Sequence, residues 1–157
     1  MQIRDAMHAD AAAACEVLRA SITELCVADH RNDPAILAAW LANKTPEIVA
    51  GWATQPDSSL LIAVDGDAVL AVGGVKDSGE ITLNYVAPAA RFRGVSSALL
   101  ATLEARAAAR GNSRCTLLST ETAHRFYLSR GYTDDGAPQE KFGTNSSYPM
   151  FRLIAGV

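Results

Sequence analysis

Residues 85–100 read YVAPAARFRGVSSALL, and this stretch decides how we interpret the rest of the chain. A short apolar segment runs into Pro88, a glycine follows at Gly94, and an apolar run with helical spacing begins at Val95. The first turn of a helix leaves backbone N–H groups without intrahelical partners, and a glycine before it lets a ligand approach them. The stretch therefore predicts a strand that ends, a helix that begins, and N–H groups that can hold a phosphate.

The turn at Gly94 does not identify a ligand by itself. A plain connection between a strand and a helix uses the same residue types, and Arg91 and Arg93 fit ordinary solvated turn positions equally well. The segment lacks the Gly-Lys-Ser/Thr sequence of a nucleoside-triphosphate loop and the three glycines of a dinucleotide fingerprint. These differences disfavour a nucleotide-binding α/β enzyme that takes ATP or NAD.

Length and composition limit the possible classes of protein. The chain has 157 residues, of which 49% are hydrophobic and 20% charged, so we expect one globular domain over residues 1–157. The formal net charge is −3, and lysine and arginine do not cluster as contacts with DNA or RNA phosphates require. We therefore expect no nucleic-acid partner.

The apolar runs and the cysteines predict a cytoplasmic protein. Runs such as AVLAVGGV at 68–75 are too short to cross a membrane, and the first ten residues lack the pattern of a signal peptide. Cys15, Cys26 and Cys115 are odd in number and lack paired metal-ligand spacing. We expect buried free thiols, no membrane contact and no metal.

The pattern along the chain alternates between strand and helix signals. Asp33 before Pro34 and Thr45 before Pro46 are typical N-caps of two short helices, and turn residues at 65–67 and 78–79 divide an apolar stretch into a three-strand meander. The other expected elements are a strand at 2–4, a helix at 11–26, a helix at 95–110, a strand at 115–119, a helix at 122–130 and a closing strand at 147–154.

A second motif follows the glycine turn about thirty residues later. Residues 120–132 read TETAHRFYLSRGY and again open a helix directly after an expected strand. The pair resembles the GCN5-related N-acetyltransferase (GNAT) superfamily, whose motifs read Q/R-x-x-G-x-G/A and N-x-x-A-x-x-x-Y-x-x-x-G-F. The matching residues are Val86, Pro88, Arg91, Gly94, Ala123, Tyr127 and Gly131, whereas Ser96, Thr120 and Tyr132 replace the usual Gly or Ala, Asn and Phe.

The resemblance implies a fold and a cosubstrate. The fold is a mixed α/β (α+β) domain with a mostly antiparallel sheet of six to seven strands, about four helices, and a splay between the fourth and fifth strands. The cosubstrate is acetyl-CoA, with its pyrophosphate on the glycine turn. The residues that the resemblance assigns to acetyl-CoA are Tyr85, Val86, Arg91, Phe92, Arg93, Gly94, Val95, Ser96, Ser97, Thr120 and Ala123.

The resemblance also implies acetyl transfer to a primary amine by direct attack on the thioester. In this interpretation Tyr127 assists the departing thiolate, and the backbone N–H of Val86 polarises the thioester carbonyl. The alternative for Tyr127 is a helix tyrosine packed in the core. Glu80, at the start of an expected strand, is the candidate general base, although a solvated turn glutamate fits the same position.

The acceptor is not identified by the sequence. Asp29, His30 and Asp33 form an alternative source of the base and the expected acceptor contacts, and together with Asp77 and Glu80 they favour a cationic amine by charge complementarity. A small molecule and a peptide both stay open, as does a homodimer. The rival function is a non-catalytic acyl-CoA-binding or regulatory module on the same fold.

Overall fold

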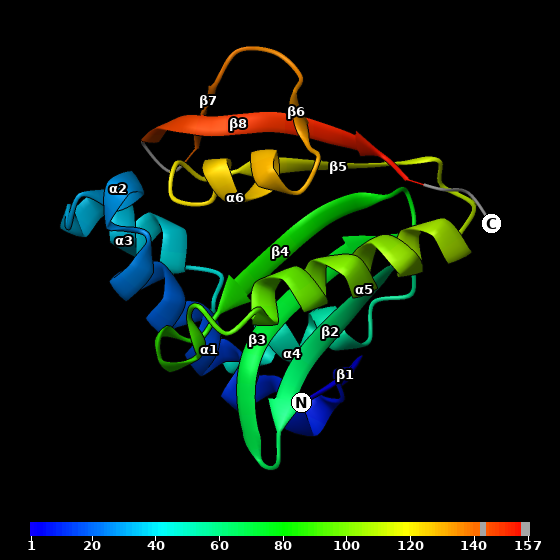
Figure 1. Ribbon diagram of the computed structural model, residues 1–157. Helices are drawn as coiled ribbons and strands as arrows, with labels where there is room; N and C mark the ends of the chain where they lie inside the picture. Colours follow the sequence, from blue (N-terminus) through cyan, green and yellow to red (C-terminus); the bar gives the residue numbers. More distant parts are fainter. Residues whose placement is uncertain (142–143, 155–157) are drawn as a thin grey trace.

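The computed structural model describes residues 1–141 and 144–154 and shows an open, strongly twisted sheet with helices packed on both faces (Figure 1). The strands are β1 (Gln2–Asp5), β2 (Ser58–Asp65), β3 (Ala68–Lys76), β4 (Glu80–Val86), β5 (Arg114–Ser119), β6 (Thr133–Asp134), β7 (Gln139–Lys141) and β8 (Thr144–Leu153). The α-helices are α1 (Ala11–Leu25), α2 (Val27–His30), α3 (Pro34–Leu41), α4 (Pro46–Ala53), α5 (Val95–Ala109) and α6 (His124–Ser129), and short 3₁₀ turns lie at His8–Asp10 and Pro88–Ala90.

The sheet has the strand order β1-β2-β3-β4-β5-β8-β6, and β7 pairs with β8. The first four strands form antiparallel pairs, β4 and β5 are parallel, and β8 is antiparallel to β5. Strands β4 and β5 can be parallel because α5 lies between them in the chain. The helix returns the chain to the end of the sheet at which β4 began, and β5 starts there.

Strands β4 and β5 touch at one end only. Their register contains two pairs, Glu80 with Thr116 and Ile81 with Leu117. Beyond Ile81 the strands diverge, and Figure 1 shows β4 turning away from β5 across the middle of the molecule. The backbone polar groups along this part of β4 therefore lack a neighbouring strand on that side.

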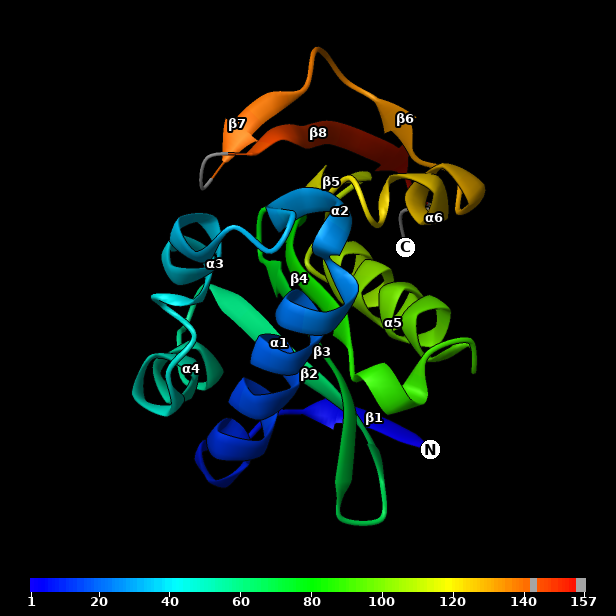
Figure 2. The same ribbon diagram turned by 90° about the vertical axis from the view of Figure 1, so that its left-hand side faces the viewer.

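Both faces of the sheet are buried, which explains why β2 reads as a continuous apolar run. Leu60, Ile62 and Val64 pack with residues of α1 and α4 on one face, whereas Leu61 and Ala63 pack with α5 on the other. Figure 2 shows α1 and α4 on the opposite side of the sheet from α5. The alternation follows from the strand period of two residues.

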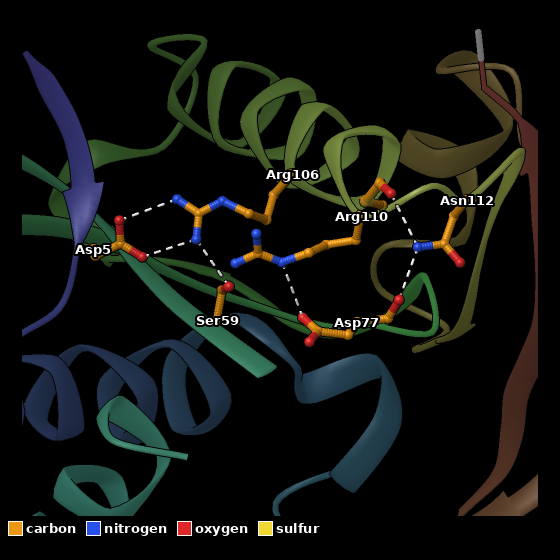
Figure 3. A network of polar contacts seen from close by, with 7 residues as sticks. Asp5, Ser59, Asp77, Arg106, Arg110 and Asn112 are labelled. Carbon is orange, nitrogen blue, oxygen red and sulfur yellow. Dashed lines mark hydrogen bonds and ion pairs between the residues drawn. The ribbon is translucent and has the colours of Figure 1, made fainter. Parts of the chain in front are cut away.

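Polar contacts fix the C-terminal half of α5 to the sheet edge (Figure 3). Arg106 makes a bidentate ion pair with Asp5 at 2.9 and 3.0 Å and also donates to Ser59 Oγ at 2.8 Å. Arg110 donates to Asp77 at 3.2 Å, and Asn112 Nδ2 donates to the Asp77 carbonyl oxygen at 2.9 Å. Helix α5 is thereby held against β1, β2 and the turn between β3 and β4.

The fold class expected from the sequence is confirmed, including the splay between β4 and β5. The described residues contain eight strands and six α-helices, which is more than the six to seven strands and four helices expected. The additional elements are short: α2 has four residues, β6 has two and β7 has three. Segments of this length contain too few residues to show a hydrophobic period.

The three cysteine side chains lie in the protein interior. Cys15, Cys26 and Cys115 are buried free thiols, as expected. Burial raises the pKa of the Cys26 thiol to about 12, and the nearby Asp29 acts in the same direction. No helix in the described part of the chain is both long and apolar enough to span a bilayer.

Candidate functional site

The glycine turn ends the segment after β4 and begins α5, as the sequence predicts. Gly94 is the N-cap of α5 with φ at +76°, a left-handed conformation that residues with a side chain rarely adopt. A Cβ at this position would meet nothing within 4 Å, so the backbone angle and not the available space requires glycine. The N-cap offers no side-chain oxygen to the first turn of α5, and the first-turn N–H groups therefore face outward without a cap.

A cavity of about 570 Å³ lies beside this turn. We call it the turn cavity. Its walls come from the C-terminal ends of α1 and β4, the first turn of α5, and α6 with the loop before it. All of the residues expected to bind the cosubstrate line it except Arg93, namely Tyr85, Val86, Arg91, Phe92, Gly94, Val95, Ser96, Ser97, Thr120 and Ala123, and Tyr127 lines it too.

The N–H of Val86 points into the splay. In an antiparallel pair, alternate residues direct their N–H groups to opposite edges of the strand. Ala87 N–H donates to the Leu70 carbonyl oxygen of β3 at 2.8 Å, so Val86, one residue earlier, directs its N–H away from β3. This group is therefore available to a ligand between β4 and β5.

Tyr127 lies at the inner wall of the turn cavity and is only 6% exposed. Its ring packs edge-on against Phe126 and Tyr132, with centroids 5.2 and 5.5 Å away. Burial raises the pKa of the Tyr127 phenol to about 12, and a side-chain hydrogen bond with Asn84 opposes this rise. The hydroxyl is consequently a neutral proton donor at physiological pH.

A narrow slot continues from the turn cavity between the diverging strands. The slot has a volume of about 40 Å³ and is lined by residues of β4 and β5 together with Thr120, Ala123 and Tyr127. It shares Asn84 and Tyr85 with the turn cavity as well. The splay thus forms a passage from the turn cavity toward the opposite face of the sheet.

A third cavity of about 260 Å³ lies on that opposite face, between α3, α4 and strands β2 to β4. We call it the aromatic cavity because Trp40, Trp52 and Tyr85 line it. Its other lining residues are Asn43, Lys44, Gln55, Ser58, Ser59, Leu60, Gly74, Lys76, Thr82 and Leu83. Thr82, Leu83 and Tyr85 also line the slot. The slot therefore shares wall residues with both the turn cavity and the aromatic cavity.

Comparison with known proteins decides the family. A family model described as an acetyltransferase (GNAT) domain matches residues 20–150. The chain belongs to the GNAT family. A search of curated proteins gave no significant match.

Solved GNAT structures share the fold over nearly the whole chain. A GCN5-related N-acetyltransferase from Rhodopseudomonas palustris is 24% identical, with 98% of this chain and 95% of that chain covered and a TM-score of 0.85. The PaiA N-acetyltransferase from Thermoplasma acidophilum, in complex with coenzyme A, is 17% identical, with 98% of each chain covered and a TM-score of 0.84. An aminoglycoside 6′-acetyltransferase type Ii is 19% identical, with 100% and 99% covered and a TM-score of 0.75. At these identities the likeness shows the fold alone.

Asp29 holds a loop of this GNAT domain and does not line any of the three cavities. Its side chain is buried and accepts hydrogen bonds from Glu121 N at 2.7 Å, Thr122 N at 3.2 Å and Thr122 Oγ1 at 2.6 Å. The expected acceptor contact at Asp29 is therefore replaced by a contact within the protein. Asp29 connects α2 to the loop that carries Thr120 and Ala123.

His30 and Asp33 likewise have hydrogen-bond partners in the protein itself, His30 in the interior and Asp33 at the surface. His30 is fully buried, its Nδ1 accepts from Asn32 N at 3.0 Å, and its Nε2 lies 2.9 Å from the Ile22 carbonyl oxygen. The proton therefore belongs on Nε2, and neither ring nitrogen is free for an acceptor. Asp33 caps α3 by accepting from Ala35 N and Ile36 N. Neither His30 nor Asp33 lines any of the three cavities.

Glu80 and Arg93 do not line the three cavities. Glu80 lies at the paired end of β4, and its carboxylate is 3.5 Å from the Lys76 ammonium. Lys76 lines the aromatic cavity, so Glu80 contacts one of the residues of the cavity wall without lining the cavity itself. Arg93 is exposed. No cluster of three His, Cys, Asp or Glu side chains suited to a metal ion occurs among the residues that the structure describes.

The sequence interpretation missed several residues of the site. Asn84 lines both the turn cavity and the slot, and Ser21, Cys26 and Phe126 line the turn cavity. Asn84 could have been found, because it is an amide in the otherwise apolar end of a strand, LNYV. Nothing local in the sequence distinguishes Ser21 or Cys26 from the other residues of their helix.

Replacing Asp29 by alanine tests its role in the loop. Asp29→Ala removes the charged acceptor of two part-buried backbone N–H groups, so we expect the free energy of unfolding to fall by about 2 to 3 kcal/mol. Urea unfolding measures this change, and Asp57→Ala, at an exposed position, serves as the control. Equal stability of the two variants would contradict the assigned role.

Proposed function

We propose that this GNAT domain transfers an acetyl group from acetyl-CoA to a primary amine by direct attack in a ternary complex. The observation that carries the proposal is the splay of β4 and β5, which connects the turn cavity on one face of the sheet to the aromatic cavity on the other. Two substrates entering from opposite faces can meet there. Two solved relatives in the fold comparison, the PaiA protein and an aminoglycoside 6′-N-acetyltransferase, are described as complexes with coenzyme A.

The turn cavity fits the phosphate end of acetyl-CoA. The uncapped N–H groups at the start of α5 and the positive end of its dipole favour an anion, and Arg91 adds a positive charge on the same wall. Ser96 and Ser97 are small, so the helix start stays accessible. The free edge of β4 at Asn84 and Val86, whose backbone groups point away from β3, offers backbone donors and acceptors for the amide groups of pantetheine.

The residues beside the splay have separate tasks in the proposed reaction. When bound, acetyl-CoA supplies the reactive thioester. Val86 N–H stabilises negative charge that develops on the thioester oxygen. Tyr127 donates a hydrogen bond, and finally a proton, to the thiolate that leaves. A thiolate has a pKa near 8.5 and leaves readily, so the help from Tyr127 is moderate.

Deprotonation of the amine is the larger requirement. An amine with a pKa of about 10.4 is neutral in only about one molecule in a few thousand at pH 7, which adds about 4 to 5 kcal/mol to the barrier. Glu80 stays our candidate for the base, because Lys76 beside it lines the aromatic cavity. His30 is no longer a candidate, since both ring nitrogens are engaged.

We assign the acceptor to the aromatic cavity and infer a small amine with an apolar or aromatic body. The cavity is lined by two indoles and a phenol among its residues and is small for a ligand site. The carboxylates that favoured a cationic acceptor have partners elsewhere: Asp29 in a loop, Asp33 in a helix cap, and Asp77 with Arg110. No carboxylate is among the described lining residues, which argues against an aminoglycoside or another polycation.

A thiol-release assay over a panel of amines tests the function. We expect acetyl-CoA to release free thiol with arylalkylamines faster than with spermidine or kanamycin, because only the former fit the aromatic cavity. Calorimetry with CoA accompanies the assay. Binding of CoA without thiol release for any amine would support a non-catalytic acyl-CoA-binding module instead.

Phenylalanine at position 127 tests the assignment of the proton donor. We expect Tyr127→Phe to lower kcat by at most about 100-fold, the low end for acid–base assistance, with a Kd for acetyl-CoA unchanged within about twofold. Because the phenol pKa is about 12, the wild-type rate should show no decline from loss of this proton up to pH 10. Full turnover of the variant at saturating acetyl-CoA would reject the assignment.

Alanine at the two ends of α5 tests the turn. Gly94 and Gly111 have φ at +76° and +91°, so Gly94→Ala and Gly111→Ala should each lower stability by about 1 kcal/mol or more. Only Gly94 lines the turn cavity, so only its variant should weaken CoA binding, by about tenfold in calorimetry. Equal Kd values for the two variants would separate the turn from CoA binding.

Two further expectations from the sequence stay predictions. The buried free thiols agree with a reducing compartment such as the cytoplasm. A homodimer is neither supported nor opposed by the contacts of a single chain.

A further inference from the structure

The Oδ1 atom of Asn84 is a buried acceptor without a hydrogen-bond partner. Among the residues that the structure describes, it is the side-chain oxygen or nitrogen that is both buried and unpaired. Native proteins pair nearly all such atoms, and an exception is commonly found where a ligand supplies the partner. The position is in the wall shared by the turn cavity and the slot.

The surroundings of Asn84 explain why the protein itself leaves Oδ1 unpaired. Asn84 lies opposite Gly73 on β3, and directly opposite residues in a sheet share a face. A Cβ at Gly73 would meet Leu99 and Leu103 of α5, so the atoms on this face are apolar. The contact of the Asn84 side chain with Tyr127 lowers the pKa of the phenol, as an amide N–H that donates to the phenol oxygen does. The amide nitrogen thus faces Tyr127, and Oδ1 points elsewhere.

We propose that Asn84 Oδ1 accepts a hydrogen bond from the attacking amine in the slot, and this inference rests on the proposed function. Tyr127 is assigned to the leaving sulfur, and nucleophile and sulfur both bond to the same carbonyl carbon. A side chain that touches Tyr127 is therefore within reach of the amine too. The edge of β4 provides backbone partners for the pantetheine amides, which leaves the side chain of Asn84 for the amine.

The role of Asn84 is orientation, because a carboxamide oxygen takes no proton at neutral pH. One N–H of the neutral amine donates to Oδ1, which turns the nitrogen lone pair toward the carbonyl carbon. The nitrogen–carbon bond forms and the carbon–sulfur bond breaks. The nitrogen then loses a proton to the base or to water, and the sulfur takes one from Tyr127. Asn84 itself is unchanged.

Leucine at position 84 separates this role from a structural one. Asn84→Leu removes both the unpaired acceptor and the amide N–H that bonds Tyr127. In the Tyr127→Phe background, where that bond is already absent, Asn84→Leu should therefore leave the melting temperature of the ligand-free protein the same or raise it, and the Kd for acetyl-CoA should stay within about twofold. The kcat/KM for the amine should fall by about 10- to 100-fold. Thr116→Val, on β5 and outside the cavity walls, is the matched polar-to-apolar control and should match wild type in all three measurements.

A double-variant cycle with Tyr127→Phe distinguishes contact with the amine from an effect through the phenol. A fall in kcat/KM of about tenfold or more should persist when Asn84→Leu is introduced into the Tyr127→Phe background, because contact with the amine does not depend on the phenol. Disappearance of the effect in the Tyr127→Phe background would show that Asn84 acts through Tyr127 alone. An equal weakening of acetyl-CoA binding would assign Oδ1 to pantetheine, and a melting temperature that falls when Asn84→Leu is added to Tyr127→Phe would show that Oδ1 has a partner in the protein. Absence of thiol release by the wild type would instead reject the proposed function, and the inference with it.

Discussion

The interaction on which the site depends is the short pairing of β4 with β5. Two residue pairs join the strands, and beyond them the middle of the sheet has an edge of unpaired backbone groups. A sheet edge inside a protein is costly unless another group pairs with it. Both flanking cavities exist because the strands part at this point, and the helices on the two faces keep the opening from closing by packing on β2, β3 and β4.

Two sets of long-range polar contacts hold the parts around this opening. The bonds of Arg106 and Arg110 fix α5 to the sheet edge at its C-terminal half (Figure 3), while the N-terminal half presents uncapped N–H groups. Asp29 fixes the loop before α6 from the other face. Charged groups therefore stabilise the frame, whereas the walls of the splay are made mainly from backbone and uncharged side chains.

The sequence predicted what is encoded locally. The helix start at Gly94, the N-caps Asp33 and Thr45 and the helix around Tyr127 depend on residues close in the chain. The structure has them where the sequence predicted them. Contacts between residues far apart in the chain could not be predicted from the sequence. An example is the contact of Asp29 with Glu121, 92 residues apart. Asp29 and His30 were expected to face an acceptor because their charge and polarity were known but their burial was not. Asp33 is exposed and caps α3. Asn84 was missed for the converse reason, since its unpaired oxygen depends on which neighbours surround it in space.

The contact between Asp29 and the loop at 121–122 has a consequence for the order in which ligands bind. Asp29 belongs to the segment that leads into α3, whose Trp40 lines the aromatic cavity, and the loop carries residues that line the turn cavity. A ligand that moves one of these segments changes the conformational free energy of the other segment through the hydrogen bonds of Asp29. By thermodynamic linkage, an acceptor that tightens cosubstrate binding through this contact is itself bound more tightly once the cosubstrate is present, by the same factor. The buried Asp29 carboxylate in α2 is thus a route for cooperativity between the two substrates of the proposed reaction.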